Sequence, residues 1–158
     1  MKRFHNRSLA ATLLILSAPT AFAQSAVLPE GLRTEYLADP LGIDVEQPRL
    51  SWTLSSARGG EKQTAYQVLV ASSPANLAKD AGDLWDSRKV TSAETAQVTY
   101  AGRTLTSRMR TWWKVRAWDA QGRPGPWSKP ATWSMGLLRE SDWDAAFIGA
   151  APPAGTPA

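Results

Sequence analysis

The sequence contains no cysteine, and its single histidine, His5, lies close to the N-terminus. Beyond the first 23 residues, the chain therefore cannot build a Ser-His-Asp or Cys-His nucleophilic system. It also lacks the usual histidine and cysteine ligands of zinc. Without a disulfide, burial of apolar side chains must stabilise the fold. We expect no bound metal and no cofactor.

Long hydrophobic runs are also missing. The longest apolar run, Leu9–Ala18, is shorter than the roughly 20 residues that a membrane-spanning helix needs. Basic residues precede it (Lys2, Arg3 and Arg7), and the small-residue pattern Ala21-Phe22-Ala23 follows it. This order is typical of a secretory signal peptide cleaved before Gln24. We therefore predict a signal peptide over residues 1–23, export to the periplasm or the cell exterior, and no membrane span.

Excess charge of one sign is absent once the signal peptide is set aside. The full sequence has 18 basic and 14 acidic residues, and the peptide carries three of the basic ones and none of the acidic ones. The remaining net charge is +1, although the precursor has a pI of about 9.7. No basic run follows that would track a phosphate backbone. We expect no nucleic-acid partner.

Apolar and polar residues instead alternate along the chain with a period of two, which places neighbouring side chains on opposite faces of a sheet. The longest example is Arg110–Asp119, with three tryptophans in one strand. Shorter strand-like segments cover residues 32–36, 49–54, 63–71, 84–87, 96–100 and 131–135. This set predicts an all-β fold, a seven-stranded antiparallel sandwich of the immunoglobulin or fibronectin type III kind over residues 31–138.

The segments outside this sandwich are predicted separately. Residues 24–30 are expected to form a disordered lead, and Ser73 with Pro74 favours one helical turn over 73–79. Residues 140–148 resemble one more strand, followed by a tail of small residues. Residues 139–158 are then the start of a following domain or a linker to it. An eighth edge strand of the same sandwich is the alternative.

Several segments together resemble a known family. They are DPLGID at 39–44, PRLSW at 48–52, QTAYQVLVA at 63–71, DLWDS at 83–87, WKVRAWD at 113–119, WS at 127–128 and MGLL at 135–138. In this order they are similar to the N-terminal fibronectin type III-like domain of bacterial α-L-rhamnosidases, glycoside hydrolase family 78. The resemblance implies that a jelly-roll domain and then a catalytic (α/α)6 barrel follow this module. It also implies inverting hydrolysis of terminal α-L-rhamnosyl groups by two carboxyl groups roughly 6.5–9.5 Å apart.

Those two carboxyl groups would belong to the barrel, so no catalytic residue is assigned within this chain. Two close pairs of carboxylates remain to be considered, Asp83 with Asp86 and Asp142 with Asp144. Alternation would place Asp142 and Asp144 on one face of a strand. Aspartates near turns usually accept hydrogen bonds from their own backbone, however. We therefore expect the module to be inactive by itself.

The tryptophans are the candidate binding residues. If Trp113 faces the core, Trp112 and Trp118 lie on the outer face with Lys114 and Arg116, whose long stems can cover the indoles through cation–π contacts. The candidate interdomain or sugar-stacking surface comprises Trp112, Trp118, Trp127, Trp143 and Phe147. We favour interdomain packing, because exposed aromatic patches usually mark interfaces. Trp52 and Trp85 are expected in the core.

The function that follows is that of a non-catalytic module at the N-terminus of an exported α-L-rhamnosidase-like glycoside hydrolase, which orients the following domains. Its partners would be those domains and, through the parent enzyme, rhamnosylated glycans. The alternative is a free-standing secreted module that binds a glycan or a protein.

Overall fold

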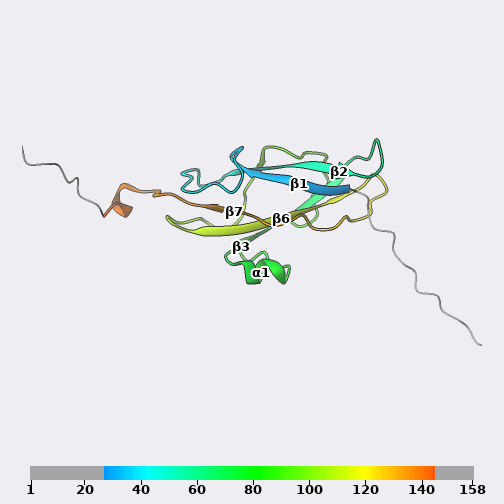
Figure 1. Ribbon diagram of the computed structural model, residues 1–158. Coiled ribbons are helices and arrows are strands. Elements are labelled where there is room, and N and C mark those ends of the chain that lie inside the picture. Colours follow the sequence, from blue (N-terminus) through cyan, green and yellow to red (C-terminus); the bar gives the residue numbers. More distant parts are fainter. Residues whose placement is uncertain (1–26, 145–158) are drawn as a thin grey trace, which may run out of the picture.

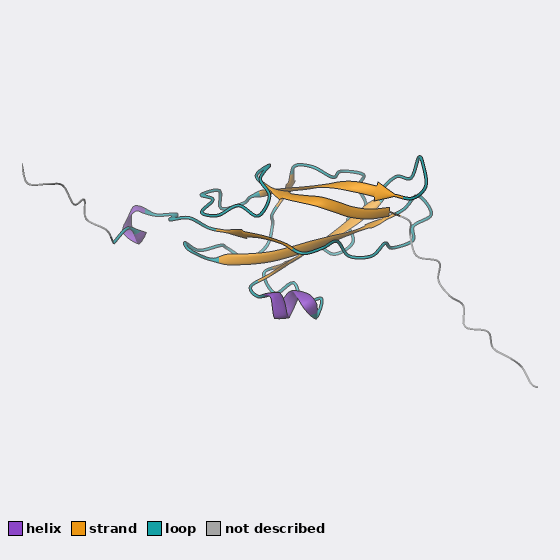
Figure 2. Cartoon of the chain, in the orientation of Figure 1, coloured by secondary structure: helices purple, strands orange, loops and turns teal. Residues whose placement is uncertain are grey.

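The computed structural model describes residues 27–144, which form two antiparallel β-sheets packed face to face (Figures 1 and 2). One sheet has the order β1-β2-β5 and the other has the order β4-β3-β6-β7. The strands are β1 (Val27–Thr34), β2 (Arg49–Ser56), β3 (Ala65–Ala71), β4 (Trp85–Asp86), β5 (Val98–Thr99), β6 (Arg110–Trp118) and β7 (Ala131–Ser134). The predicted seven-stranded immunoglobulin-like sandwich is confirmed.

The strands β3 and β6 form the centre of the larger sheet, where they pair antiparallel from Ala65 opposite Trp118 to Ala71 opposite Trp112. Their alternation decides which side chains enter the core. Val68 and Val70 of β3 face the other sheet, while Leu69 faces the opposite side. Both faces of β3 are therefore buried, as expected for a central strand with apolar residues on both sides.

Indole rings fill much of the space between the sheets. Trp113 and Trp133 are fully buried and Trp52 is 3% exposed, whereas Trp85 is half-buried against the same cluster. The Trp52 ring meets Tyr66 edge-on, with centroids 5.2 Å apart, and its Nε1 donates to Gln63 Oε1 at 3.1 Å. Burying each aromatic side chain contributes several kcal/mol, so these rings supply a large share of the stability.

A short helix, α1 (Pro74–Ala78), lies on the outer face of the larger sheet (Figure 1). Ser73 is its N-cap, and the Ser73 hydroxyl accepts a hydrogen bond from the Asn76 amide at 3.1 Å. Leu77 is buried against Leu69 and Ala71 of β3. The sequence prediction of a capped helical turn at this place is confirmed.

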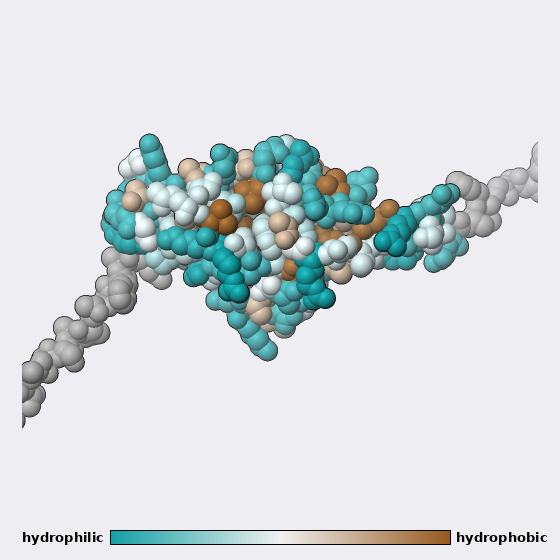
Figure 3. Space-filling model, turned by 180° about the vertical axis from the view of Figure 1, so that it is seen from behind, coloured by the Kyte–Doolittle hydropathy of each residue, from teal (hydrophilic) through white to brown (hydrophobic). Residues whose placement is uncertain are grey.

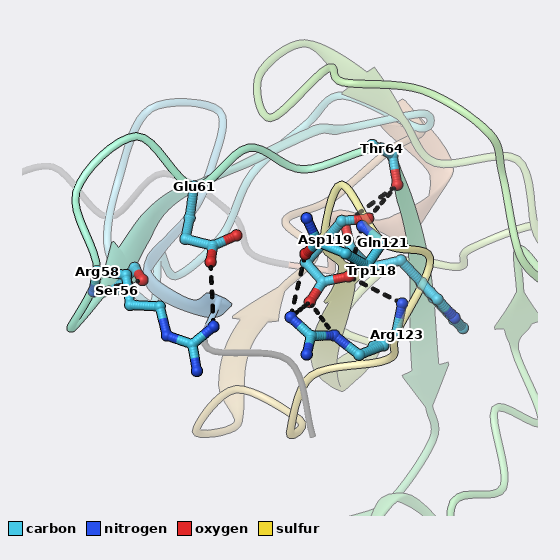
Figure 4. A network of polar contacts seen from close by, with 8 residues as sticks. All are labelled: Ser56, Arg58, Glu61, Thr64, Trp118, Asp119, Gln121 and Arg123. Atoms are coloured by element: carbon cyan, nitrogen blue, oxygen red, sulfur yellow. Dashed lines mark hydrogen bonds and ion pairs between the residues drawn. The ribbon is translucent and has the colours of Figure 1, made fainter. Parts of the chain in front are cut away.

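At the end of β6, the Asp119 carboxylate organises the turn that follows (Figure 4). It accepts hydrogen bonds from the amides of Gln121 and Arg123 at 3.0 and 2.9 Å and from Arg123 Nε at 2.8 Å. The Thr64 hydroxyl donates to the Asp119 carbonyl at 2.6 Å, which ties the turn to the start of β3. Hydrogen bonds within the turn and a hydrogen bond from Thr64 therefore both hold the turn in place.

Two sequence predictions need correction at the N-terminal end. Residues 27–30 belong to β1 instead of a disordered lead, because Val27 is buried beneath the sandwich and pairs with Ser56. The strand also ends earlier than expected, at Thr34. Glu35 and Tyr36 have φ angles of 48° and 66°, a left-handed conformation that cannot continue an extended strand. Residues 24–26 lie outside the described part, as does the predicted signal peptide.

The predicted strand at 140–148 is wrong where the structure describes it. Glu140–Asp142 form a single 3-10 turn, in which the Asp142 side chain accepts a hydrogen bond from the Arg139 amide at 3.2 Å. Such local side-chain bonding favours a turn over an extended strand. Asp142 and Asp144 therefore do not share one face of a strand. Residues 145–148 lie outside the described part.

Candidate functional site

Basic and indole side chains alternate along the outer face of β6. Trp113, Val115 and Ala117 are fully buried, so Trp112, Lys114, Arg116 and Trp118 lie on the other side. Trp127 joins this row because residues 125–128 return along β6, where the Gly125 and Ser128 amides donate to the carbonyls of Ala117 and Val115. We call this row the β6 ladder: Arg110, Trp112, Lys114, Arg116, Trp118 and Trp127.

Cation–π contacts hold the β6 ladder together, as the alternation predicted. The Arg116 guanidinium lies 4.6 Å from the ring centroid of Trp127 and 5.0 Å from that of Trp118. The Lys114 ammonium lies 5.0 Å from the Trp127 centroid, and Arg110 lies 5.4 Å from Trp112. The charged groups therefore occupy ring faces on which a sugar ring would otherwise stack.

The helix α1 covers the same face. Lys114 Nζ donates to the Leu77 carbonyl at 2.7 Å and forms an ion pair with Asp80, and Lys114 is only 7% exposed. Trp112 and Trp127 pack against the cluster around Leu77. Trp118 is buried, whereas Trp112 and Trp127 are half-buried. These indoles are thus built into the module, and the partner that meets their remaining surface stays a prediction.

The structure does not bring Trp143 to the β6 ladder. Trp143 follows the 3-10 turn at the end of the described chain and is 60% exposed. It lines a shallow hollow with Leu137, Leu138, Arg139 and Glu140. Phe147, the fifth predicted surface residue, lies outside the described part. The sequence had grouped side chains that occupy two different regions.

A second apolar surface, which the sequence analysis missed, surrounds the point where the chain leaves the sandwich. Leu37, Leu41 and Val45 are exposed and belong to the loop between β1 and β2. Figure 3 shows apolar atoms next to the departing C-terminal segment, in addition to others near the middle of the same face. We call Leu37, Leu41, Val45 and Trp143 the exit surface. No periodic pattern in the loop signals it.

Backbone hydrogen bonds hold this loop against β7 and the segment after it. The Ser134 amide donates to the Pro40 carbonyl at 3.0 Å, and the Gly136 amide donates to the Ile43 carbonyl at 2.7 Å. A Cβ atom on Gly136 would come within 2.9 Å of the Gly42 carbonyl oxygen, so glycine permits this close approach. The loop therefore has a defined position beside the departing chain.

A groove of about 690 Å³ lies between β1 and residues 126–131. Trp127 lines it together with the polar residues Glu30, Asp39 and Lys129. An aromatic side chain beside carboxylates and an amine can contact a sugar by stacking and hydrogen bonding. In this groove, the predicted surface residue Trp127 lies in a hollow that also contains carboxylates and an amine.

The first carboxylate pair serves turns. Asp83 accepts hydrogen bonds from the Ser72 amide at 3.0 Å and from the Ser72 hydroxyl. Burial favours the neutral acid, but these hydrogen bonds outweigh it and hold the pKa of Asp83 below its usual value. Asp86 instead accepts from Gln67 Nε2 at 2.7 Å and from the Arg88 amide at 2.8 Å. A general acid requires a raised pKa, which Asp83 does not have.

The second pair also has structural partners. The Ser107 hydroxyl donates to Asp142 and lowers its pKa, and the Arg139 amide adds a further hydrogen bond. Asp144 forms a long ion pair with Arg108, at 3.9 Å. Within residues 27–144, no three histidine, cysteine, aspartate or glutamate side chains gather as metal ligands would. No helix in that range is long and apolar enough to cross a membrane.

The fold and these contacts define the class of protein: an immunoglobulin-like sandwich domain whose described carboxylate pairs have structural partners. The family model described as "Rha78A-like, N-terminal immunoglobulin domain" matches residues 29–139. The chain belongs to this family.

Its relatives are much longer proteins. An α-L-rhamnosidase of Streptomyces avermitilis is 49% identical over 119 residues, which cover 75% of this chain and 11% of the relative. An α-L-rhamnosidase of Formosa agariphila is 36% identical over 141 residues, 87% of this chain and 15% of the relative. The crystal structure of the Streptomyces avermitilis α-L-rhamnosidase complexed with L-rhamnose superposes with a TM-score of 0.77 and 46% identity, over 81% of this chain and 12% of that one. The chain thus spans a small fraction of the proteins that it matches.

Proposed function

We propose that this chain is the non-catalytic N-terminal module of an exported α-L-rhamnosidase-like glycoside hydrolase, and that it orients the domains that follow it. The observation that carries the proposal is the match of residues 29–139 to an N-terminal domain family, together with the small share of each rhamnosidase that the chain covers. The parent enzyme would remove terminal α-L-rhamnosyl groups with inversion of configuration. Its substrates would be rhamnosylated glycans outside the cytoplasm.

Several properties of the described residues support a positioning role. Asp83, Asp86 and Asp142 accept structural hydrogen bonds, and the pKa values of Asp83 and Asp142 are lowered instead of raised. The described chain begins and leaves at opposite ends of the sandwich (Figure 1). A following domain would therefore be joined at the end of the sandwich opposite the start of β1.

The first test of the proposed function is whether the open reading frame continues beyond Ala158. We expect the genomic sequence to encode several hundred more residues after Ala158. The longer polypeptide should hydrolyse an aryl α-L-rhamnoside, and the 158-residue chain should give no turnover under the same conditions. Turnover by the 158-residue chain that survives repurification would contradict the non-catalytic role. A stop codon directly after Ala158 would contradict the parent enzyme.

The second candidate function is a free-standing secreted module that binds a glycan or a protein. The groove beside Trp127 favours it, because Glu30, Asp39 and Lys129 line the same hollow. If this function is correct, calorimetry should detect binding of rhamnosylated oligosaccharides to the 158-residue chain. Trp127→Ala should abolish that binding, whereas the exposed Trp143→Ala should leave it unchanged. Absence of heat at millimolar ligand would exclude glycan binding by the isolated module.

A further inference from the structure

We propose that the exit surface, formed by Leu37, Leu41, Val45 and Trp143, is the contact surface for the domain that follows residue 144. This inference rests on the proposed function, since it requires a longer parent polypeptide. It assigns the interdomain contact to a region other than the β6 ladder, in which Trp118 is buried and Trp112 and Trp127 are half-buried.

The distribution of exposed apolar side chains is the first argument. The large hydrophobic residues exposed in the described chain are Leu28, Tyr36, Leu37, Leu41, Val45 and Trp143. All except Leu28 lie in the β1–β2 loop or at the end of the described chain. Leu41 is 78% exposed and Trp143 is 60% exposed. A group of apolar residues at one end of a small domain usually marks an interface.

The second argument is that the backbone presents these side chains in a fixed arrangement. The bonds from Ser134 to Pro40 and from Gly136 to Ile43 hold the loop against the departing chain. Gly42 adds another bond, from its amide to the Ser134 hydroxyl at 3.0 Å. A surface that is already ordered loses little conformational entropy when a partner covers it. The loop therefore has the properties of a prepared docking surface.

The third argument concerns polar side chains next to the apolar group. A hollow of about 370 Å³ is lined by Glu46, the residue after Val45, and by Arg108, Arg139 and Asp142 among others. Arg108 Nη2 donates to the Asp142 carbonyl at 2.7 Å, so the chain is still anchored to the sandwich two residues before the described part ends. An apolar centre with a polar rim is the usual composition of a protein interface.

The continuation of the chain indicates which partner would cover the exit surface. Trp143 is itself part of the exit surface, so whatever is joined after residue 144 begins beside it. The family is an N-terminal domain family, and the matched rhamnosidases have most of their length outside this region. A covalently attached domain acts at a high effective concentration and competes well against a free partner. A second copy of this chain has no such advantage.

The absence of cysteine permits a direct experiment. Leu41→Cys and Val45→Cys each place a thiol on the exit surface, and Leu28→Cys places one on the exposed apolar residue outside it. Each variant is made in the 158-residue chain and in the longer polypeptide. Maleimide labelling rates are measured by mass spectrometry of the peptide that carries the introduced thiol. Circular dichroism verifies that each variant is folded.

We expect all three thiols to react rapidly in the 158-residue chain. In the longer polypeptide, the thiols at 41 and 45 should react at least tenfold more slowly, whereas the thiol at 28 should keep its rate. Equal rates at 41 and 45 in an active longer polypeptide would overturn this inference and leave the proposed function intact. If the frame ends after Ala158, or the longer polypeptide has no rhamnosidase activity, the proposed function fails and this inference fails with it.

Discussion

The ammonium of Lys114 lies 5.0 Å from the ring centroid of Trp127 while it also donates a hydrogen bond to the Leu77 carbonyl at 2.7 Å. One side chain thus connects β6, α1 and the segment that returns after the β6 turn. A buried ammonium requires such partners, because an unpaired charge in this position would be strongly destabilising. The relationship explains why a basic residue occupies a site with only 7% exposure.

The cation–π contact of this pair can be measured by a double-mutant cycle. Lys114→Met and Trp127→Leu each retain an apolar side chain, and the double variant removes both partners. We expect a coupling free energy of about 0.5–2 kcal/mol, because the pair is largely desolvated. Urea unfolding of the four proteins gives this value. The exposed Lys62→Met serves as the matched control, and its effect should be additive with Trp127→Leu. Additivity of Lys114→Met with Trp127→Leu would show that the contact contributes nothing.

Trp52→Ala should strongly destabilise the module. Trp52 is 3% exposed and packs edge-on against Tyr66, so its truncation leaves a large cavity and removes the donor to Gln63 Oε1. Tryptophan-to-alanine changes in cores cost about 3–5 kcal/mol, and small domains have roughly 5–15 kcal/mol in total. Urea unfolding followed by circular dichroism measures the loss. Trp143→Ala removes an equally large but exposed ring and should change stability by less than about 0.5 kcal/mol in the 158-residue chain. An unaltered transition in Trp52→Ala would contradict its place in the core.

The Asp119 carboxylate predicts an acid-dependent loss of stability. Burial would raise its pKa, but the hydrogen bonds from Arg123 outweigh burial and hold the pKa of Asp119 below its usual value. A lowered folded-state pKa stabilises the fold above the unfolded-state pKa of about 3.9, and this stabilisation disappears as pH falls through the lower folded value. The free energy of unfolding should therefore decrease below about pH 4.

Asp119→Asn removes the titrating group and should flatten that decrease, in addition to weakening the turn at neutral pH. Urea midpoints between pH 2.5 and 7 provide the measurement. Asp44→Asn changes the formal charge equally at an exposed position and should leave the slope of stability against pH close to that of the unaltered chain. An identical pH slope in Asp119→Asn would show that this carboxylate is not responsible.

The sequence predicted most of the sandwich because alternation records which side of a strand is buried. The inward set of β6, with Trp113 and Val115, follows from a period of two, and the outward position of Lys114 follows from the same rule. Sequence could not predict the end of β1, where Glu35 and Tyr36 adopt left-handed conformations. It also could not predict the 3-10 turn, because a side-chain hydrogen bond decided between a turn and a strand.

The candidate surfaces were predicted less completely. Alternation placed Trp112 and Trp118 on the outer face, but the position of Trp127 depends on the return path of residues 119–130, which is a tertiary feature. The exit surface was missed because Leu37, Leu41 and Val45 lie in a loop without periodicity. Their proximity to the departing chain arises from bonds between residues 40–43 and 134–136, which are far apart in the sequence.

Those bonds between the β1–β2 loop and the departing chain also decide how the module responds to mechanical load. Ile43 and Met135 form a parallel bridge, and a pull on the chain through Trp143 would slide the segment after β7 along the β1–β2 loop. The hydrogen bonds at Pro40, Ile43 and Ser134 then resist shear together instead of opening one after another. A pull from the C-terminal side would therefore load the β1–β2 loop of one sheet as well as β7 of the other.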